Sequence, residues 1–183
     1  LIAERALEAS NLRKQVRELT ERSTDMPDLI GRSTAMNGLR QTIEKVAPTN
    51  SRIMIIGASG SGKELVARTI HRLSNRAAGP FVVLNAAAIT PDRMEIELFG
   101  TEAVNGSGRK VGALEEAHGG TLYLDEVGDM PRETQNKILR VLVEQSFQRV
   151  GGATKVNVDV RIVLSTARDL EREIGEGTFR EDL

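Results

Sequence analysis

Apolar positions follow two kinds of pattern along most of the chain, short continuous runs and helical repeats. Four continuous runs predict strands buried on both faces, at 52–56, 81–84, 121–124 and 158–164. Helical spacing predicts helices through Leu39 and Ile43, through Leu65, Val66 and Ile70, and through Ile138, Leu139, Leu142 and Val143. Strands separated by helices predict an α/β fold, with helices on both faces of a parallel sheet.

Two residues are expected to mark helix starts in this region. Ser33 is a suitable N-cap for the helix through Leu39, and Pro131 suits the first turn of the long helix.

Residues 1–22 predict one further helix, rich in strong helix formers and free of glycine and proline. Its apolar residues form a short heptad pattern with charges on the other faces, through Ile2, Leu12 and Leu19. This pattern suits either a dimerising coiled coil or an amphipathic helix packed on its own domain. The breaker at 23–27 predicts a boundary, so we expect a linker helix at 1–24 and an α/β domain at 25–183.

The amino-acid composition argues against several classes of protein. The 183 residues carry 25 basic and 26 acidic side chains, so no basic excess points to nucleic acid. The absence of cysteine excludes disulfides and thiolate metal sites, and two histidines, His71 and His118, argue against a zinc enzyme. No apolar run approaches the length of a membrane span, and the start does not resemble a signal peptide. We therefore expect a cytoplasmic protein without membrane contact.

The strongest chemical motif is a glycine-rich loop that follows the strand at 52–56 and opens a helix. It consists of Gly57, Ala58, Ser59, Gly60, Ser61, Gly62 and Lys63, followed by Glu64 and Leu65. Glycines allow backbone amides to point inward, the helix N-terminus favours anions, and the lysine reaches the terminal phosphates. The motif predicts a nucleotide site, with ATP as the expected ligand. Glu64 stands where Ser or Thr usually ligates Mg²⁺, and its carboxylate is expected to face away from the phosphates.

An acidic pair, Asp125 and Glu126, ends the strand at 121–124. In a P-loop fold, an acidic residue at the end of a neighbouring strand holds Mg²⁺, which we assign to Asp125. A second carboxylate, here Glu126, can orient and deprotonate an attacking water. The simpler interpretation is a solvated pair of carboxylates at a strand end.

The residues around these motifs resemble the AAA+ domain of sigma-54-dependent activators, the NtrC family of response regulators. The matching runs lie at 30–33, 57–67, 84–88, 97–100, 119–126, 140–142, 147–152, 159–162 and 179–183. The resemblance implies a P-loop AAA+ three-layer domain and an ATPase that assembles into a ring. The helix at 1–24 resembles the connector that follows a phosphoryl-accepting receiver domain.

The resemblance also implies roles for individual residues. Asn85 would restrain Glu126 until the ring is ready, and Arg180 matches a finger arginine that reaches a neighbouring subunit's ATP. Ile30 and Gly31 match residues lining the adenine pocket. A lid and a DNA-binding domain would follow residue 183, and a receiver domain that accepts phosphate from a sensor kinase would precede the chain. The chain is accordingly expected to be a fragment of a larger protein.

Two departures from the family pattern bear on function. The loop that grips the sigma factor in the family, Gly-Ala-Phe-Thr-Gly-Ala, is replaced by a shorter segment without an aromatic residue at 103–110. The family's Ala-Thr-Asn after the last strand, whose asparagine senses the γ-phosphate, is replaced by Ser165, Thr166 and Ala167. The altered loop, together with the run at 109–117, suggests the NtrX-like branch and an action that does not use the standard sigma-54 contact. The missing asparagine suggests weak hydrolysis or weak coupling of hydrolysis to movement.

The sequence therefore predicts the ATP-binding domain of a two-component response-regulator transcription factor, dimeric through its first helix or assembled into a larger ring. The alternative is an active ring ATPase that remodels the transcription machinery. Other conspicuous side chains receive ordinary roles: His71 and His118 are expected at the surface or in packing, and Glu115 and Glu116 on a solvated helix face. For Arg149, an interface role and a salt bridge both remain open.

Overall fold

The computed structural model describes residues 28–102 and 108–183. The chain divides into two units, Leu1–Ile30 and Gly31–Leu183. The predicted linker helix at 1–24 lies outside the described residues, as do residues 103–107 of the altered loop.

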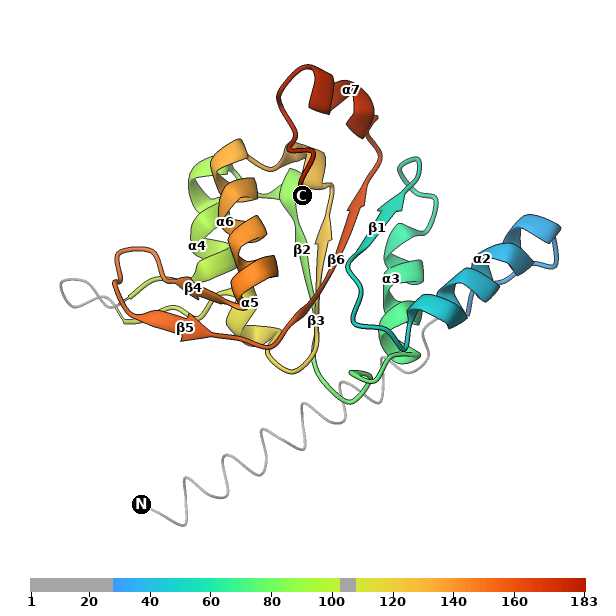
Figure 1. Cartoon of the computed structure of the whole chain (residues 1–183), viewed down its shortest axis with the longest axis horizontal. Coiled ribbons are helices and arrows are strands. Elements are labelled where there is room, and N and C mark those ends of the chain that lie inside the picture. Colours follow the sequence, from blue (N-terminus) through green and yellow to red (C-terminus); the bar gives the residue numbers. More distant parts are fainter. Residues whose placement is uncertain (1–27, 103–107) are drawn as a thin grey trace, which may run out of the picture. The chain divides into compact units, whose positions relative to one another are not determined.

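A four-stranded parallel sheet forms the centre of the larger unit, in the order β1-β6-β3-β2 (Figure 1). Its strands are β1 (Ile53–Ile56), β2 (Phe81–Asn85), β3 (Thr121–Asp125) and β6 (Arg161–Thr166). A separate antiparallel hairpin pairs β4 (Ser146–Gln148) with β5 (Lys155–Asn157). The sheet explains why the apolar runs are continuous, since parallel strands are covered on both faces.

Helices cover both faces of the sheet, as predicted. On one face lie α2 (Thr34–Val46) and α3 (Lys63–Arg72), and on the other lie α4 (Pro91–Phe99), α5 (Ala113–Glu116) and α6 (Arg132–Glu144) (Figure 1). Two short 3₁₀ turns, η2 (Ala86–Ala88) and η3 (Val127–Asp129), follow strand ends, and α7 (Leu170–Gly175) follows β6. The fold is the predicted α/β P-loop architecture.

Strand alternation divides the core between these two faces. Leu122 and Leu124 of β3 pack with the α4–α6 side, whereas Tyr123 packs with Ala67 of α3 and Val163 of β6. Successive side chains of a strand point to opposite faces, so residues at odd positions of β3 share the α3 face. This places the Asp125 side chain on the same face as Tyr123 and the helix that follows the glycine-rich loop.

Helix starts and ends agree with local chemistry in most places. The Ser33 hydroxyl accepts a hydrogen bond from the Met36 amide at 3.2 Å, which confirms the predicted cap of α2. Pro131 lies at the N-cap of α6, one position before its expected place in the first turn. Within the described ranges, no helix is long and apolar enough to cross a membrane.

One prediction from apolar patterning was wrong. The run at 158–164 is not one strand, because β6 begins only at Arg161 and β5 ends at Asn157. Val158 and Val160 are nevertheless buried, so their hydrophobicity reflects core packing between two strands. Val143 lies within α6, as the helical spacing predicts, and its side chain is 69% exposed.

Candidate functional site

The carboxyl ends of the parallel strands gather the predicted site residues at one edge of the sheet. Ile56 of β1 pairs in register with Thr166 of β6, and Asn85 of β2 pairs with Asp125 of β3. Ligands of open α/β sheets bind in the crevice beyond these strand ends. The topology therefore places the glycine-rich loop beside the acidic strand end.

The loop itself has the backbone geometry that its glycines permit. Gly60 and Gly62 have positive φ angles of 75° and 90°, which favour glycine because side chains clash there. A Cβ at Gly57 would lie 2.8 Å from the Ser61 hydroxyl. Within the described part of the chain, the amides of Gly60, Gly62 and Lys63 make no hydrogen bond, so they are open to an acceptor. Gly62 is the N-cap of α3, where the helix dipole favours an anion.

Lys63 lies at the base of this loop and is only 7% exposed. Its ammonium group donates to the carbonyl oxygens of Gly57 at 3.1 Å and Ala58 at 3.4 Å. It also forms an ion pair with Glu126 Oε1 at 3.0 Å. The charge that would bind a terminal phosphate is thus held by a carboxylate across the crevice.

Glu126 is fixed from two sides. Oε1 contacts Lys63, and Oε2 accepts a hydrogen bond from the Ala167 amide at 2.9 Å. Its φ angle of 53° is in the left-handed region that side-chain-bearing residues seldom adopt. The two contacts hold the carboxylate at the mouth of the loop, where an attacking water and a phosphate would meet.

Asp125 is oriented by two hydroxyl groups that the sequence reasoning did not consider. Its Oδ1 accepts hydrogen bonds from Tyr123 Oη at 3.0 Å and Ser165 Oγ at 2.5 Å. The two hydroxyls are themselves 2.8 Å apart. Burial, opposed in part by the Ser165 hydrogen bond, raises the pKa of Tyr123, so its hydroxyl stays protonated as a donor. Oδ2 remains on the other side of the carboxylate, facing Asn85.

Asn85 was expected to restrain Glu126, and Glu64 to point away from the phosphates. The Asn85 amide donates to Asp125 Oδ2 at 3.5 Å, and its oxygen accepts from the Ala87 amide at 2.9 Å. Among the described residues, the Asn85 side-chain amide therefore contacts Asp125 and not Glu126. Glu64 pairs with Arg68 one turn along α3 at 2.6 Å, and its side chain is 49% exposed. The Glu64 carboxylate is thus paired within α3, and its expected orientation away from bound phosphates stays a prediction.

The family resemblance also implies roles for Arg180, Gly31 and Ile30, which lie near the two ends of the described chain. Arg180 donates to both carboxylate oxygens of Asp182 and to Asn136 of α6. These contacts are with its own chain. Gly31 has a φ angle of 134°, and its carbonyl accepts a bond from Arg40 at 2.6 Å. Ile30 belongs to the other unit, and its side chain is 84% exposed.

The base of the altered loop is held by a buried arginine. Arg149, just after β4, binds both carboxylate oxygens of Glu115 at 2.7 Å and also pairs with Glu102. Arg109 adds a second contact to Glu115 at 2.8 Å. The expectation of a solvated Glu115 was wrong, since its side chain is 14% exposed and shared by two arginines. Of the roles left open for Arg149, the structure shows a salt bridge within the chain.

The sequence contained usable signals for the contacts that were missed. Tyr123 and Asp125 are two positions apart in one strand, so period-two alternation places them on one face. Ala167 lacks the side-chain amide of the family's asparagine, but its backbone N–H binds Glu126. Backbone donors are identical at every non-proline residue, so sequence gives no sign of which one is used.

Comparisons with known proteins agree with the geometry. The model of the sigma-54 interaction domain matches residues 29–183. The nitrogen assimilation regulatory protein NtrX of Azorhizobium caulinodans is 63% identical over 183 residues, covering 100% of this chain and 40% of the relative. The DNA-binding transcriptional regulator NtrC of Proteus hauseri is 45% identical over 185 residues, covering 100% and 39%.

A solved structure extends the likeness to three dimensions. The crystal structure of NtrX from Brucella abortus in complex with ATP has a TM-score of 0.82 and 69% sequence identity. It covers 100% of this chain and 38% of that chain. The chain thus spans about 40% of the length of the curated relatives it matches. From the family match, the fold and the P-loop edge together, the chain belongs to the sigma-54 interaction domain family and is homologous to the regulators NtrX and NtrC.

Proposed function

We propose that this chain binds ATP through its glycine-rich loop, as the central domain of a cytoplasmic two-component response regulator. The observation that carries the proposal is the open set of loop amides around Lys63, a buried cation opposite Glu126. This arrangement offers backbone donors and a positive charge to a polyphosphate. The ATP complex of the Brucella abortus relative supports the choice of nucleotide.

The site residues take the following roles in the proposal. The backbone from Gly57 to Gly62 and the adjoining Lys63, Glu64 and Leu65 would surround the phosphates. For Ile30 and Gly31, the proposal keeps the role that the family resemblance implies, contact with the adenine base. Arg180 would bind the ATP of a neighbouring subunit. To do so, its guanidinium would first have to break its hydrogen bonds with Asp182.

Asp125 is the proposed ligand of Mg²⁺. No group of three or more His, Cys, Asp or Glu side chains within the described ranges could hold a metal. A single carboxylate nevertheless fits Mg²⁺, which commonly uses one or two carboxylates together with nucleotide phosphates and water. Bound there, the ion would neutralise phosphate charge, while Tyr123 and Ser165 keep the Asp125 carboxylate in one orientation.

Partner interactions are also proposals. A receiver domain and its sensor kinase, a DNA-binding domain, and self-association through the helix at 1–24 or into a ring are supported by the homology to NtrX and NtrC. We propose that the protein does not use the usual sigma-54 contact, because the sequence at 103–110 lacks the aromatic anchor of that loop. ATP would then serve as a regulatory ligand.

An active ring ATPase is the second candidate. The observation that favours it is the retention of Glu126 at the mouth of the loop, 3.0 Å from Lys63. To separate the two, ATP binding and phosphate release are measured on one preparation across protein concentration. The regulatory proposal expects saturable binding with phosphate release at the background level of Glu126→Gln. Turnover per chain that rises with concentration in the wild type, and not in Glu126→Gln, would instead establish the ring ATPase.

Removing the Tyr123 hydroxyl tests the proposed metal site. In Tyr123→Phe, Asp125 loses one of the two donors on Oδ1, and we expect the gain in ATP affinity on adding Mg²⁺ to fall about threefold to tenfold. ATP affinity without Mg²⁺ should stay unchanged, which calorimetric titration with and without EDTA can measure. Phe81 is the matched control, since Phe81→Leu alters the ring that packs beside Tyr123 without touching Asp125. Equal Mg²⁺ effects in all three proteins would contradict the role of the hydroxyl.

A further inference from the structure

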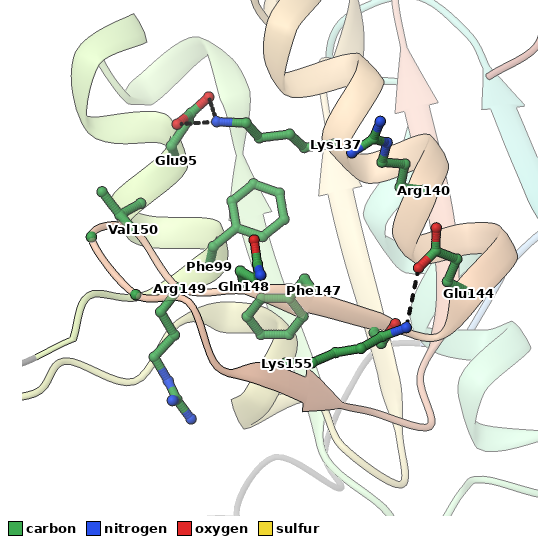
Figure 2. A pocket seen from close by; sticks show the side chains of 13 residues that line it. Glu95, Phe99, Lys137, Arg140, Glu144, Phe147, Gln148, Arg149, Val150 and Lys155 are labelled. Carbon is green, nitrogen blue, oxygen red and sulfur yellow. Dashed lines mark hydrogen bonds and ion pairs between the residues drawn. The ribbon is translucent and has the colours of Figure 1, made fainter.

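A pocket of about 540 Å³ lies among α4, α6 and the β4–β5 hairpin, away from the glycine-rich loop. Phe99 of α4 and Phe147 of β4 lie against each other in it, with ring centroids 5.6 Å apart and planes tilted by 57° (Figure 2). This volume is in the range of small-molecule sites, and such sites combine apolar walls with a few placed polar groups. None of the site residues assigned above lines it.

Most of the cations around the aromatic pair are neutralised within the chain. Lys137 binds Glu95 at 2.7 Å, and Lys155 binds Glu144 at 3.3 Å, as the dashed lines in Figure 2 show. The Arg149 guanidinium is turned away from the aromatic pair (Figure 2) and binds Glu115, which lies outside the pocket lining. These pairs leave little uncompensated charge on three of the four cations.

Arg140 is the exception. It lines the pocket from α6, and in the described part of the chain it makes no hydrogen bond or ion pair. A guanidinium offers five donors in a planar fork that matches a carboxylate. The pocket lining therefore combines one positive charge that is available to a ligand, on Arg140, with the two aromatic rings.

Ser146 adds a second, independent feature. It lines the pocket at the start of β4, is 3% exposed, and its hydroxyl has no partner among the described residues. Buried hydroxyls are almost always hydrogen-bonded, so an unpaired one at a pocket calls for an explanation. An acceptor atom entering the pocket would supply the missing bond.

We propose that this pocket binds a small organic anion, a molecule with one carboxylate on a flat apolar body. The apolar body packs on Phe99 and Phe147, and the carboxylate pairs with Arg140 and accepts a hydrogen bond from Ser146. A single negative charge matches the single unpaired cation. Glu95 and Glu144 also line the pocket, and their charges disfavour a ligand with several negative groups.

The proposal is tested with phenylacetate as the probe, titrated into the 183-residue chain and followed by amide chemical shifts. Phenylacetamide is the neutral control with the same body, and acetate is the anion without the ring. We expect saturable shifts centred on β4 and the adjoining end of α6, at least fivefold weaker binding of both controls, and no dependence on protein concentration. Arg140→Gln should weaken phenylacetate binding at least fivefold and Ser146→Ala about threefold. The matched control Arg172→Gln, an exposed arginine of α7 paired with Glu176, should leave it unchanged.

Three outcomes would overturn the proposal. Equal binding of phenylacetamide would show that the pocket recognises only an apolar body, and equal binding of acetate would show a general surface charge effect. Pocket signals that shift with protein concentration while phenylacetate causes no change would assign this surface to a second copy of the chain. Ser146→Ala removes a hydroxyl without a partner and should fold normally. Unchanged phenylacetate binding in this variant would therefore exclude the proposed hydrogen bond even if Arg140→Gln proved unstable.

Discussion

Replacing Lys63 with alanine is expected to weaken ATP binding by roughly 100-fold, or about 2.8 kcal/mol. Lys63 is the buried cation at the loop, and a charge-assisted bond to a phosphate is among the strongest polar contacts a protein makes. The substitution also leaves Glu126 without its ion pair, so an uncompensated carboxylate would face the incoming phosphates. Both effects act in the same direction. Fluorescence titration with a labelled ATP analogue would measure the loss.

Two variants make this prediction sharper. Lys110→Ala removes an exposed lysine that pairs with Glu97, and its ATP affinity should equal that of the wild type. Glu126→Gln keeps the shape of the side chain but removes the charge that competes for Lys63, so ATP should bind severalfold more tightly. Unchanged or weaker binding in Glu126→Gln would mean that the Lys63–Glu126 ion pair does not oppose nucleotide entry.

Replacing Arg149 with methionine is expected to lower the free energy of unfolding by about 2 kcal/mol at neutral pH. The arginine side chain is 7% exposed and binds Glu115 and Glu102 together. Removing one partner of a buried ion pair leaves charges without compensation, and partial exposure of the glutamates reduces the cost below that of a fully buried pair. Methionine retains much of the apolar stem, so the loss reports mainly the charge. Urea unfolding at pH 7 measures it.

A control variant and the pH dependence of stability distinguish the loss of the Arg149 ion pairs from a general loss of packing. Arg109→Met removes an arginine that contacts the same Glu115 but is 50% exposed, and it should cost less than about 0.5 kcal/mol. The hydrogen bonds from Arg149 lower the pKa of Glu115 from its ordinary value near 4.5. The unfolded chain then binds more protons just below that pH, so this stability is present at neutral pH and lost as pH falls through the lower folded pKa. A difference between wild type and Arg149→Met that does not shrink as the pH is lowered below 4.5 would assign the effect to packing.

Much of the fold and of the site followed from local chemistry that sequence displays directly. Continuous apolar runs identified β1, β2 and β3, and the glycine-rich loop between β1 and α3 identified the nucleotide edge. Parallel pairing then placed Asn85 beside Asp125 in register, because strands that enter a sheet in the same direction end at the same edge.

The remaining contacts depend on tertiary packing, which local patterns do not encode. The short acidic stretch predicts that Glu115 is solvated. Only folding brings Arg149, 34 positions away in the sequence, into contact with it. Val158 and Val160 are buried in the core although they lie between β5 and β6. A prediction based on hydrophobicity alone therefore includes them in one strand with the residues that follow. The hydroxyl of Ser165 acquires its role only when β6 lies beside β3 and brings it to Asp125.

The position of β1 affects how oligomerisation experiments should be interpreted. Within the described ranges this strand pairs only with β6, and its apolar side chains end in Ile56, which is 67% exposed. A strand with one unsatisfied side can recruit another chain by edge-to-edge hydrogen bonding. Growth of particle size with concentration would therefore not by itself demonstrate a functional ring. Mixing a Lys63→Ala chain with an Arg180→Ala chain is more discriminating. The Lys63→Ala chain could supply its intact Arg180 to the intact Lys63–Glu126 site of the other chain, so restored hydrolysis would require a shared site, which strand pairing does not provide.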